Sequence, residues 1–417
     1  MWLRAAYKEP NKAWLRDDPS IGVDTYIQSL DLDIGPEGHL LIVWTDCTQD
    51  PSTGGGCLVR ARRRSSVASG WGLMERLDNP GTAEPIQYAQ ALAGPDGRFV
   101  VLWDERNFST FVSSYWAIAY NVPPGAWDLT PTNISGPRES FYQTQAVIDP
   151  AGTVTAGFLA LSSPGNQRNY SSTRNPVTGT WSGAVPISQE SKFISGPRLG
   201  VGQDGTVSAA WAEGNPSMTA WTVFANSRDA GDIWGTTATQ IAPWRKTISD
   251  PYVGIWPGGS TMVVWAEEHG SRPASEDEAV FYSVRPPHEN WGAGGEGQIG
   301  GWFDTVFFNM DLDMGLDGSA GVIWSVTDSN RPTNQQQAVF SAFWPPGGQW
   351  NPPDQLSDWQ QSVWVERQDS LVLDKMGNFV GALWYENRLA APEFAIFFRG
   401  SGLIDQRVML PIVLKSE

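Results

Sequence analysis

One pattern of apolar and polar residues recurs seven times along the chain, and each copy contains a turn glycine. These glycines are Gly38, Gly97, Gly152, Gly205, Gly259, Gly318 and Gly377. The positions six and four residues before each glycine are apolar, while the position seven residues before it carries a polar group. This alternation with a period of two predicts a strand with two different faces, followed by a hairpin turn at the glycine.

Each copy continues with more strands. The segment after the turn is an almost continuous apolar run, such as residues 40–44 and 99–103, which predicts a strand buried on both faces. A third strand follows, for example at 220–226 and 279–284, and then a turn, a tryptophan and a short fourth strand. Four strands in roughly 40–60 residues are typical of a propeller blade. We therefore predict an all-β fold: a seven-bladed β-propeller of four-stranded antiparallel blades, a single domain over 1–417 whose terminal strands close the ring.

Composition narrows the range of partners. The chain has 28 Lys and Arg against 45 Asp and Glu, a net charge of −17. Nucleic acid, whose phosphates attract basic surfaces, is therefore not an expected partner. No apolar run reaches the roughly 18 residues that span a bilayer, so we expect no membrane insertion. The start of the sequence lacks an apolar signal segment, and we interpret the chain as a mature fragment of an extracellular or cell-surface protein, monomeric or one module of a larger protein.

The polar residues seven positions before the turn glycines are the first candidate ligand-binding groups. We call them the polar column: Asp31, Gln90, Gln145, Arg198, Tyr252, Asp311 and Ser370. The first strand of a propeller blade lines the central channel, so we expect these side chains at the channel mouth. There they would form a convergent polar pocket for a cation or a ligand rich in hydroxyl groups. The alternative is that they only line the wet channel.

A second set of acidic residues follows the tryptophan that ends the second strand in most copies. It comprises Asp46, Asp104, Glu105, Glu213, Glu267, Glu268 and Glu386. Crowded carboxyl groups raise one another's pKa, as a general acid requires. They also attract Ca²⁺, although the chain has no dense run of oxygen ligands. The alternative is that these charges keep strand edges soluble. We predict no metal site and no cofactor.

The two cysteines, Cys47 and Cys57, flank the loop between the second and third strands of the first copy. A hairpin brings such positions close together, so one prediction is a disulfide and the other is a pair of free buried thiols. A disulfide would indicate an oxidising compartment.

The tryptophans form two recurring columns, one at the end of the second strand and one after the third-strand turn. We expect both columns to pack the blades. The tryptophans outside these columns are candidate platforms for a ligand: Trp116, Trp221, Trp244, Trp256, Trp302, Trp344, Trp359 and Trp364.

Residues 227–234, Ser-Arg-Asp-Ala-Gly-Asp-Ile-Trp, match the pattern Ser-x-Asp-x-Gly-x-x-Trp. The match resembles the Asp-box of sialidase/BNR-repeat β-propellers and stands, as it does there, in the turn between the third and fourth strands. This resemblance implies a structural role for Ser227, Asp229, Gly231 and Trp234. The chain departs from the family's sialidases in lacking their Phe-Arg-Ile-Pro motif, in having only Arg198 in the polar column where three arginines are needed, and in having seven repeats rather than six.

Two functions are compatible with this resemblance. The first is a non-catalytic, extracytoplasmic binding propeller that recognises a glycan or a protein surface at the channel mouth. The alternative is a sialidase-like glycoside hydrolase. Asp31 or Asp311 would then be its acid/base, and Tyr252 with Glu213 or Glu267 its nucleophile pair. The near equivalence of the copies favours binding, because an active site requires one blade to differ strongly from the others.

Overall fold

The computed structural model describes residues 2–7, 15–22, 26–47, 56–65, 70–78, 86–107, 112–122, 125–136, 140–163, 165–270, 272–273, 277–292, 296–333, 335–360, 362–365, 371–373, 379–387 and 394–399. Within these ranges the protein is all-β, its strands pair antiparallel, and the one helical element is a 3₁₀ turn at Pro95–Gly97. The chain forms two compact units, Met1–Pro164 with Asn169–Pro186, and Gly165–Arg168 with Ile187–Glu417.

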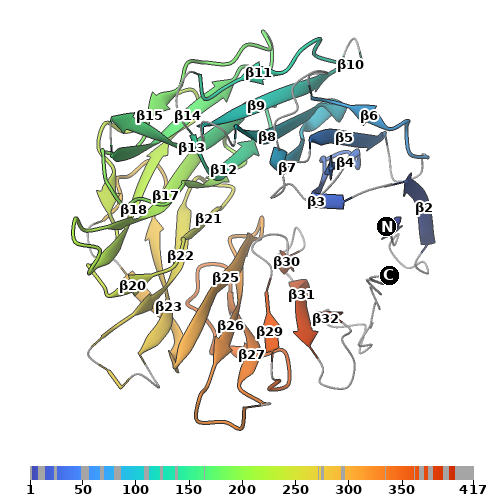
Figure 1. The fold of residues 1–417 in the computed structure, drawn as a ribbon. Coiled ribbons are helices and arrows are strands. Elements are labelled where there is room, and N and C mark those ends of the chain that lie inside the picture. The colour runs from blue at the N-terminus through green and yellow to red at the C-terminus, as the bar shows by residue number, and fades with distance from the viewer. Residues whose placement is uncertain are drawn as a thin grey trace. The chain divides into compact units, whose positions relative to one another are not determined.

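Three sheets occur in the first unit (Figure 1). The first pairs β1 (Trp2–Tyr7) with β2 (Leu15–Gly22). The second has the order β3 (Tyr26–Ile34), β4 (Leu40–Cys47), β5 (Cys57–Arg64) and β6 (Glu75–Arg76). The third is nine-stranded and joins two repeats, because β9 pairs with β12. Its strands are β7 (Ile86–Ala93), β8 (Phe99–Asn107), β9 (Val112–Asn121), β10 (Ala126–Trp127), β11 (Thr132–Asn133), β12 (Ser140–Ile148), β13 (Val154–Ser163), β14 (Asn166–Arg174) and β15 (Val185–Pro186).

Four sheets follow in the second unit. The first contains β16 (Arg198–Val201), β17 (Val207–Gly214), β18 (Trp221–Arg228) and β19 (Thr239–Gln240). The second contains β20 (Thr247–Ile248), β21 (Tyr252–Ile255), β22 (Thr261–Glu268), β23 (Glu278–Arg285) and β24 (Glu296–Phe303). The third contains β25 (Thr305–Met314), β26 (Ala320–Thr327), β27 (Gln337–Trp344) and β28 (Asp354–Gln355). The fourth contains β29 (Ser362–Trp364), β30 (Leu371–Leu373), β31 (Phe379–Asn387) and β32 (Phe394–Arg399).

The repeated turn and the buried second strand have the predicted form. Among the turn glycines described, φ lies between 69° and 93°, a region that side chains with a Cβ rarely adopt. The tryptophans that follow on the second strands, Trp44, Trp103, Trp211, Trp265 and Trp324, are at most 2 % exposed. Truncating a core tryptophan to alanine costs about 3–5 kcal/mol. These side chains are therefore the main anchors of the sheets.

The first strands of successive repeats pack closely against each other inside each unit. A Cβ added at Gly200 of β16 would lie 2.9 Å from Cγ1 of Val253 in β21. One added at Gly254 would collide with the side chain of Met314 in β25. Glycine at these positions permits the close spacing of the first strands that positions the polar column.

The all-β prediction is confirmed, and so is the antiparallel pairing. Seven blades, and a single ring over 1–417 closed by the terminal strands, remain predictions. The turn at Gly377, the polar group of Ser370 and the side chain of Glu386 lie outside the described residues.

Candidate functional site

Three of the seven polar residues that precede the turn glycines, Asp31, Gln90 and Asp311, bind the backbone of the next repeat. Asp31 Oδ2 accepts a 2.8 Å hydrogen bond from the amide of Ala91, and Asp311 Oδ2 accepts one of 2.8 Å from that of Leu371. Gln90 bonds to Ala146 twice: its Oε1 accepts from the amide at 2.8 Å and its Nε2 donates to the carbonyl at 2.9 Å. We call these contacts the inter-repeat bonds, because each connects the first strands of neighbouring repeats within one unit.

The two aspartates use both carboxylate oxygens. Oδ1 of Asp31 accepts a hydrogen bond of 2.9 Å from the amide of Leu32, and Oδ1 of Asp311 accepts one of 3.0 Å from that of Leu312. Asp311 is only 8 % exposed. These side chains therefore join strands, a role that the sequence pattern did not predict.

Arg198 and Tyr252 lie together in the second unit. The guanidinium carbon of Arg198 is 5.8 Å from the centre of the Tyr252 ring, and its Nη2 is 3.9 Å from the carboxylate of Asp250. The Tyr252 hydroxyl accepts a 3.2 Å hydrogen bond from the amide of Met310. Gln145 is half-buried in β12. The ligand-binding role of the column stays a prediction.

The acidic residues after the second-strand tryptophan have different surroundings. Asp46 forms a 2.6 Å ion pair with Nε of Arg60. The side chain of Glu267 is fully buried, with a 2.7 Å ion pair to Nε of Arg245 and a 3.0 Å hydrogen bond from Nε1 of Trp265. Burial raises the pKa of Glu213, against hydrogen bonds with Ser191 and Trp211. The carboxylate of Glu267 is fully buried and already bonded to Arg245 and Trp265, so Glu267 is a poor candidate for the predicted nucleophile pair.

Asp104 in β8 is the most buried of these carboxyl groups in the first unit. It is 1 % exposed and accepts a 2.8 Å hydrogen bond from the amide of Tyr88. Burial raises the pKa of Asp104 to about 7, although the bond from Tyr88 opposes the rise. Asp104 therefore changes its charge near neutral pH.

One end of the sheet formed by β20–β24 gathers several carboxylates. Antiparallel pairing puts four residues in one row across this sheet: Thr247, Glu268, Glu278 and Phe303. Lys246 donates a hydrogen bond to Glu268, and Thr247 donates another, of 3.0 Å, to its second oxygen. Oε2 of Glu278 accepts a 2.6 Å hydrogen bond from the amide of Val306 in β25. We call Lys246, Thr247, Glu267, Glu268, Asp277 and Glu278 the carboxylate edge.

Glu268 and Glu278 hold their protons differently. Burial would raise the pKa of Glu268, but Lys246 and Thr247 keep it below its usual value. Burial raises the pKa of Glu278 to about 7 against the bond from Val306, and Glu268 adds to the rise. At neutral pH Glu268 is ionised while Glu278 is partly protonated, a division that acid–base chemistry uses.

An exposed tryptophan adjoins the carboxylate edge. Trp244 is 43 % exposed, more than any other tryptophan whose side chain the structure describes. It directly precedes Arg245 and Lys246, which pair with Glu267 and Glu268. At the other end of the row Trp302 lies 5.3 Å from the ring of His269 and 4.5 Å from the guanidinium of Arg272. Both tryptophans were candidate platforms from the sequence. Asp277 and Glu278 were not singled out as acidic candidates, although Asp277 directly precedes the third strand and Glu278 is its first residue, a position that could have identified them.

Residues 227–234 link two sheets of the second unit. Oγ of Ser227 accepts a 3.1 Å hydrogen bond from Nε1 of Trp291, and Oδ2 of Asp229 lies 2.9 Å from Nδ1 of His288. His288 holds the pKa of Asp229 below its usual value. Gly231 has a φ of 76°, and Trp234 is 8 % exposed. The turn after β18 is thereby tied to the turn after β23.

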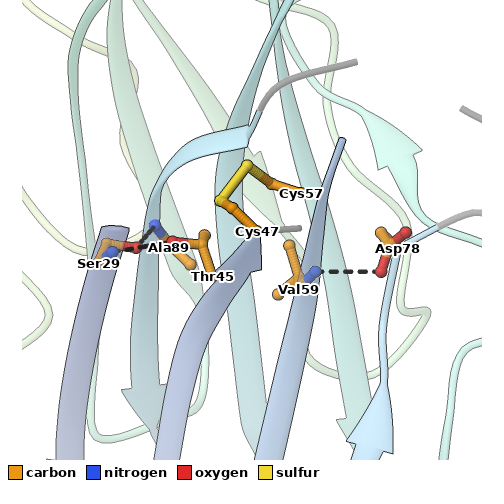
Figure 2. The surroundings of a disulfide bond; sticks show 7 residues. All are labelled: Ser29, Thr45, Cys47, Cys57, Val59, Asp78 and Ala89. Carbon is orange, nitrogen blue, oxygen red and sulfur yellow. Dashed lines mark hydrogen bonds between the residues drawn. A yellow bond between two sulfur atoms is a disulfide. The ribbon is translucent and has the colours of Figure 1, made fainter. Parts of the chain in front are cut away.

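Cys47 and Cys57 form a disulfide between directly paired residues of β4 and β5, with Cα atoms 4.0 Å apart (Figure 2). The amide of the neighbouring Ser29 donates a 2.8 Å hydrogen bond to Oγ1 of Thr45 in β4, and Asp78 accepts one of 3.0 Å from the amide of Val59 in β5. The disulfide therefore closes the β4–β5 hairpin, and residues on either side of this hairpin are hydrogen-bonded to it.

Among the residues described, no three His, Cys, Asp or Glu side chains are grouped so that they could hold a metal ion. The same part of the chain contains no helix with the length and apolar character needed to cross a membrane.

No family model and no curated protein matches this sequence. Solved structures do match. An ulvan lyase of polysaccharide lyase family PL25, bound to -[GlcA(1-4)Rha3S]-, is 9 % identical at a TM-score of 0.51, over 88 % of this chain and 91 % of its own. The GH93 α-L-arabinofuranosidase of Fusarium graminearum with arabinobiose is 13 % identical at 0.44, over 78 % and 91 %. The α-L-arabinanase of Penicillium chrysogenum with arabinobiose is 10 % identical at 0.42, over 72 % and 88 %.

These neighbours are β-propeller enzymes that act on glycans. At such identities the likeness concerns the fold alone. Of these three structures, the ulvan lyase has a TM-score above 0.5, so the argument about the fold rests on it. The β-propeller class is therefore supported, while membership of the sialidase/BNR-repeat family stays a prediction.

Proposed function

We propose that the protein is an extracytoplasmic β-propeller of seven blades that binds a glycan. The observation that carries this proposal is the exposed Trp244 beside the carboxylate edge. An aromatic face stacks on a sugar ring, and the carboxylate and ammonium groups of Glu268 and Lys246 match hydroxyl groups, which both donate and accept hydrogen bonds. The disulfide between Cys47 and Cys57 supports an oxidising compartment.

In this proposal, the polar column has two roles. Asp31, Gln90 and Asp311 join blades through the inter-repeat bonds, and Arg198 with Tyr252 offers a further contact to the ligand. Residues 227–234 are a structural Asp-box, as in sialidase-like propellers, because their contacts tie neighbouring turns together.

A glycan array with the whole chain tests the proposal, using Trp244→Ala and a matched control. The control is Ile233→Ala, which removes an apolar side chain that is 85 % exposed in the same unit. We expect the wild type to bind at least one glycan, Trp244→Ala to weaken that binding about tenfold, a loss of about 1.4 kcal/mol, and Ile233→Ala to leave it unchanged. No bound glycan, or equal effects of the two variants, would overturn the proposal.

The alternative function is a glycoside hydrolase, and the pairing of Glu268 with Glu278 favours it. These residues face each other across β22 and β23, one ionised and one partly protonated at neutral pH. Release of reducing ends from a bound glycan, lost in Glu278→Gln while binding persists, would establish hydrolysis. Binding without any release would leave the non-catalytic function.

A further inference from the structure

A second candidate site lies in the first unit, at the end of β5 away from the disulfide. The cavity there has a volume of about 370 Å³, within the range of small-ligand pockets. Its lining includes Arg63 and Arg64 at the end of β5, His39 in the turn before β4, and Phe99 and Tyr120 from β8 and β9.

Arg63 is held rigidly at the cavity. Its Nε and Nη2 donate hydrogen bonds of 2.9 and 3.1 Å to the two oxygens of Glu75, and its guanidinium carbon lies 3.6 Å from the centre of the Tyr120 ring. Tyr120 in turn packs against Trp127, at 5.5 Å between ring centres. The guanidinium of Arg63 is therefore held against the Tyr120 ring before any ligand arrives, which lowers the entropy cost of binding.

Basic side chains outnumber acidic ones in the lining of the cavity, although the chain as a whole is acidic. Two guanidinium groups, from Arg63 and Arg64, line it, and Asp96 contributes the one carboxylate of its lining. The chain itself carries a net charge of −17. Arg64 is only 5 % exposed, and its guanidinium carbon lies 5.9 Å from the ring of Trp71. Glu75 offsets the charge of Arg63, but the guanidinium donors in the lining still favour an anionic group over a neutral one.

We infer that this cavity binds an anionic sugar unit, one that carries a carboxylate or a sulfate group. The planar guanidinium groups match the oxygens of such an anion, while Phe99 and Tyr120 provide an apolar wall for the ring. This site is separate from the glycan-binding surface proposed around Trp244, and it uses none of the same residues.

Two glycine variants test the inference with the full chain. A Cβ added at Gly70, in the cavity lining, or at the exposed Gly183, elsewhere in the same unit, meets no atom within 4 Å. Gly70→Asp places a carboxylate in the cavity, and Gly183→Asp makes the same change in charge away from it. The thermal unfolding of both variants should match that of the wild type.

Binding is measured by calorimetry with glucuronate, glucose 6-sulfate, glucose and inorganic sulfate. We expect a charged sugar to bind about tenfold tighter than glucose, Gly70→Asp to weaken that binding about tenfold, and Gly183→Asp to leave it unchanged. Binding of only one charged sugar identifies the anion. The inference would be overturned if glucose bound as tightly as the charged sugars, or if the two variants had equal effects. It would also be overturned if inorganic sulfate bound as tightly as the sugar sulfate, or if no sugar bound at concentrations up to about 10 mM. Trp244→Ala should leave this binding unchanged, which separates it from the proposed function.

Discussion

Gln90 hydrogen-bonds to both backbone groups of Ala146, a residue 56 positions further along the chain. Gln90→Leu would leave the buried amide and carbonyl of Ala146 without these partners. An unsatisfied buried polar group costs about 1–3 kcal/mol, so we expect a loss of at least about 2 kcal/mol in the free energy of unfolding. Urea unfolding measures it. Gln189→Leu is the control, because Gln189 is exposed and its side chain makes no such bond; a loss no larger than that of the control would contradict a structural role for the inter-repeat bonds.

The disulfide should contribute measurably to stability. Cys47 and Cys57 lie 10 positions apart in the sequence, and closing a loop of this length stabilises a fold by about 2–3 kcal/mol in the chain-entropy account. We expect the double variant Cys47→Ser, Cys57→Ser to unfold at correspondingly lower urea concentration. Adding a reductant should lower the stability of the wild type and leave that of the variant unchanged. A wild type that is indifferent to reductant would contradict this.

Asp104 should make stability depend on pH. The folded protein keeps the proton of Asp104 up to about pH 7, whereas an unfolded chain loses it near its usual pKa of 3.8. The folded state binds more protons in between, so the contribution of this group to stability falls as the pH rises from about 4 to 7 and is level above that. Asp104→Asn keeps the acceptor for Tyr88 and has no proton to lose. From about pH 4 to 7 the free energy of unfolding of Asp104→Asn should therefore rise relative to that of the wild type. A difference between the two proteins that does not change with pH would contradict this prediction.

Arg245 should be needed mainly because Glu267 is buried. Arg245→Met leaves the carboxylate of Glu267 without its 2.7 Å partner, and breaking a buried pair costs about 3–5 kcal/mol. The double variant Arg245→Met, Glu267→Gln removes the charge as well and should lose less than the single variant. Chemical unfolding of these two variants and of Glu267→Gln gives the free energies of unfolding for a double-mutant cycle. Additive losses would show that the two residues do not interact.

The sequence predicted the turns and the buried strands because both depend on local chemistry. Positive φ at Gly38 or Gly205 and the burial of Trp44 or Trp211 follow from residues within a few positions. The polar column was predicted in the correct strands, but the bond of Asp31 to the following repeat was not predicted. Its partner, the amide of Ala91, is 60 residues away, and a single sequence does not show that separation as a contact.

The candidate site shows the same limit. Glu267 and Glu268 were identified as acidic residues after a core tryptophan, yet the row that joins Glu268 to Glu278 depends on the register of β22 against β23. The length of the intervening loop does not reveal that register. The exposed face of Trp244 likewise depends on which neighbours cover it, and only the folded chain decides that.

The inter-repeat bonds make the alignment of the first strands independent of the length of the chain that connects them. Asp31, Gln90 and Asp311 each reach the same position of the following first strand, although the intervals are 60, 56 and 60 residues. The alignment of these strands is therefore set by side chains rather than by the length of the connecting chain. Loops on such a scaffold are free to lengthen, shorten or be exchanged during evolution or in the laboratory, so new binding surfaces can be acquired while the strands that carry them stay in register.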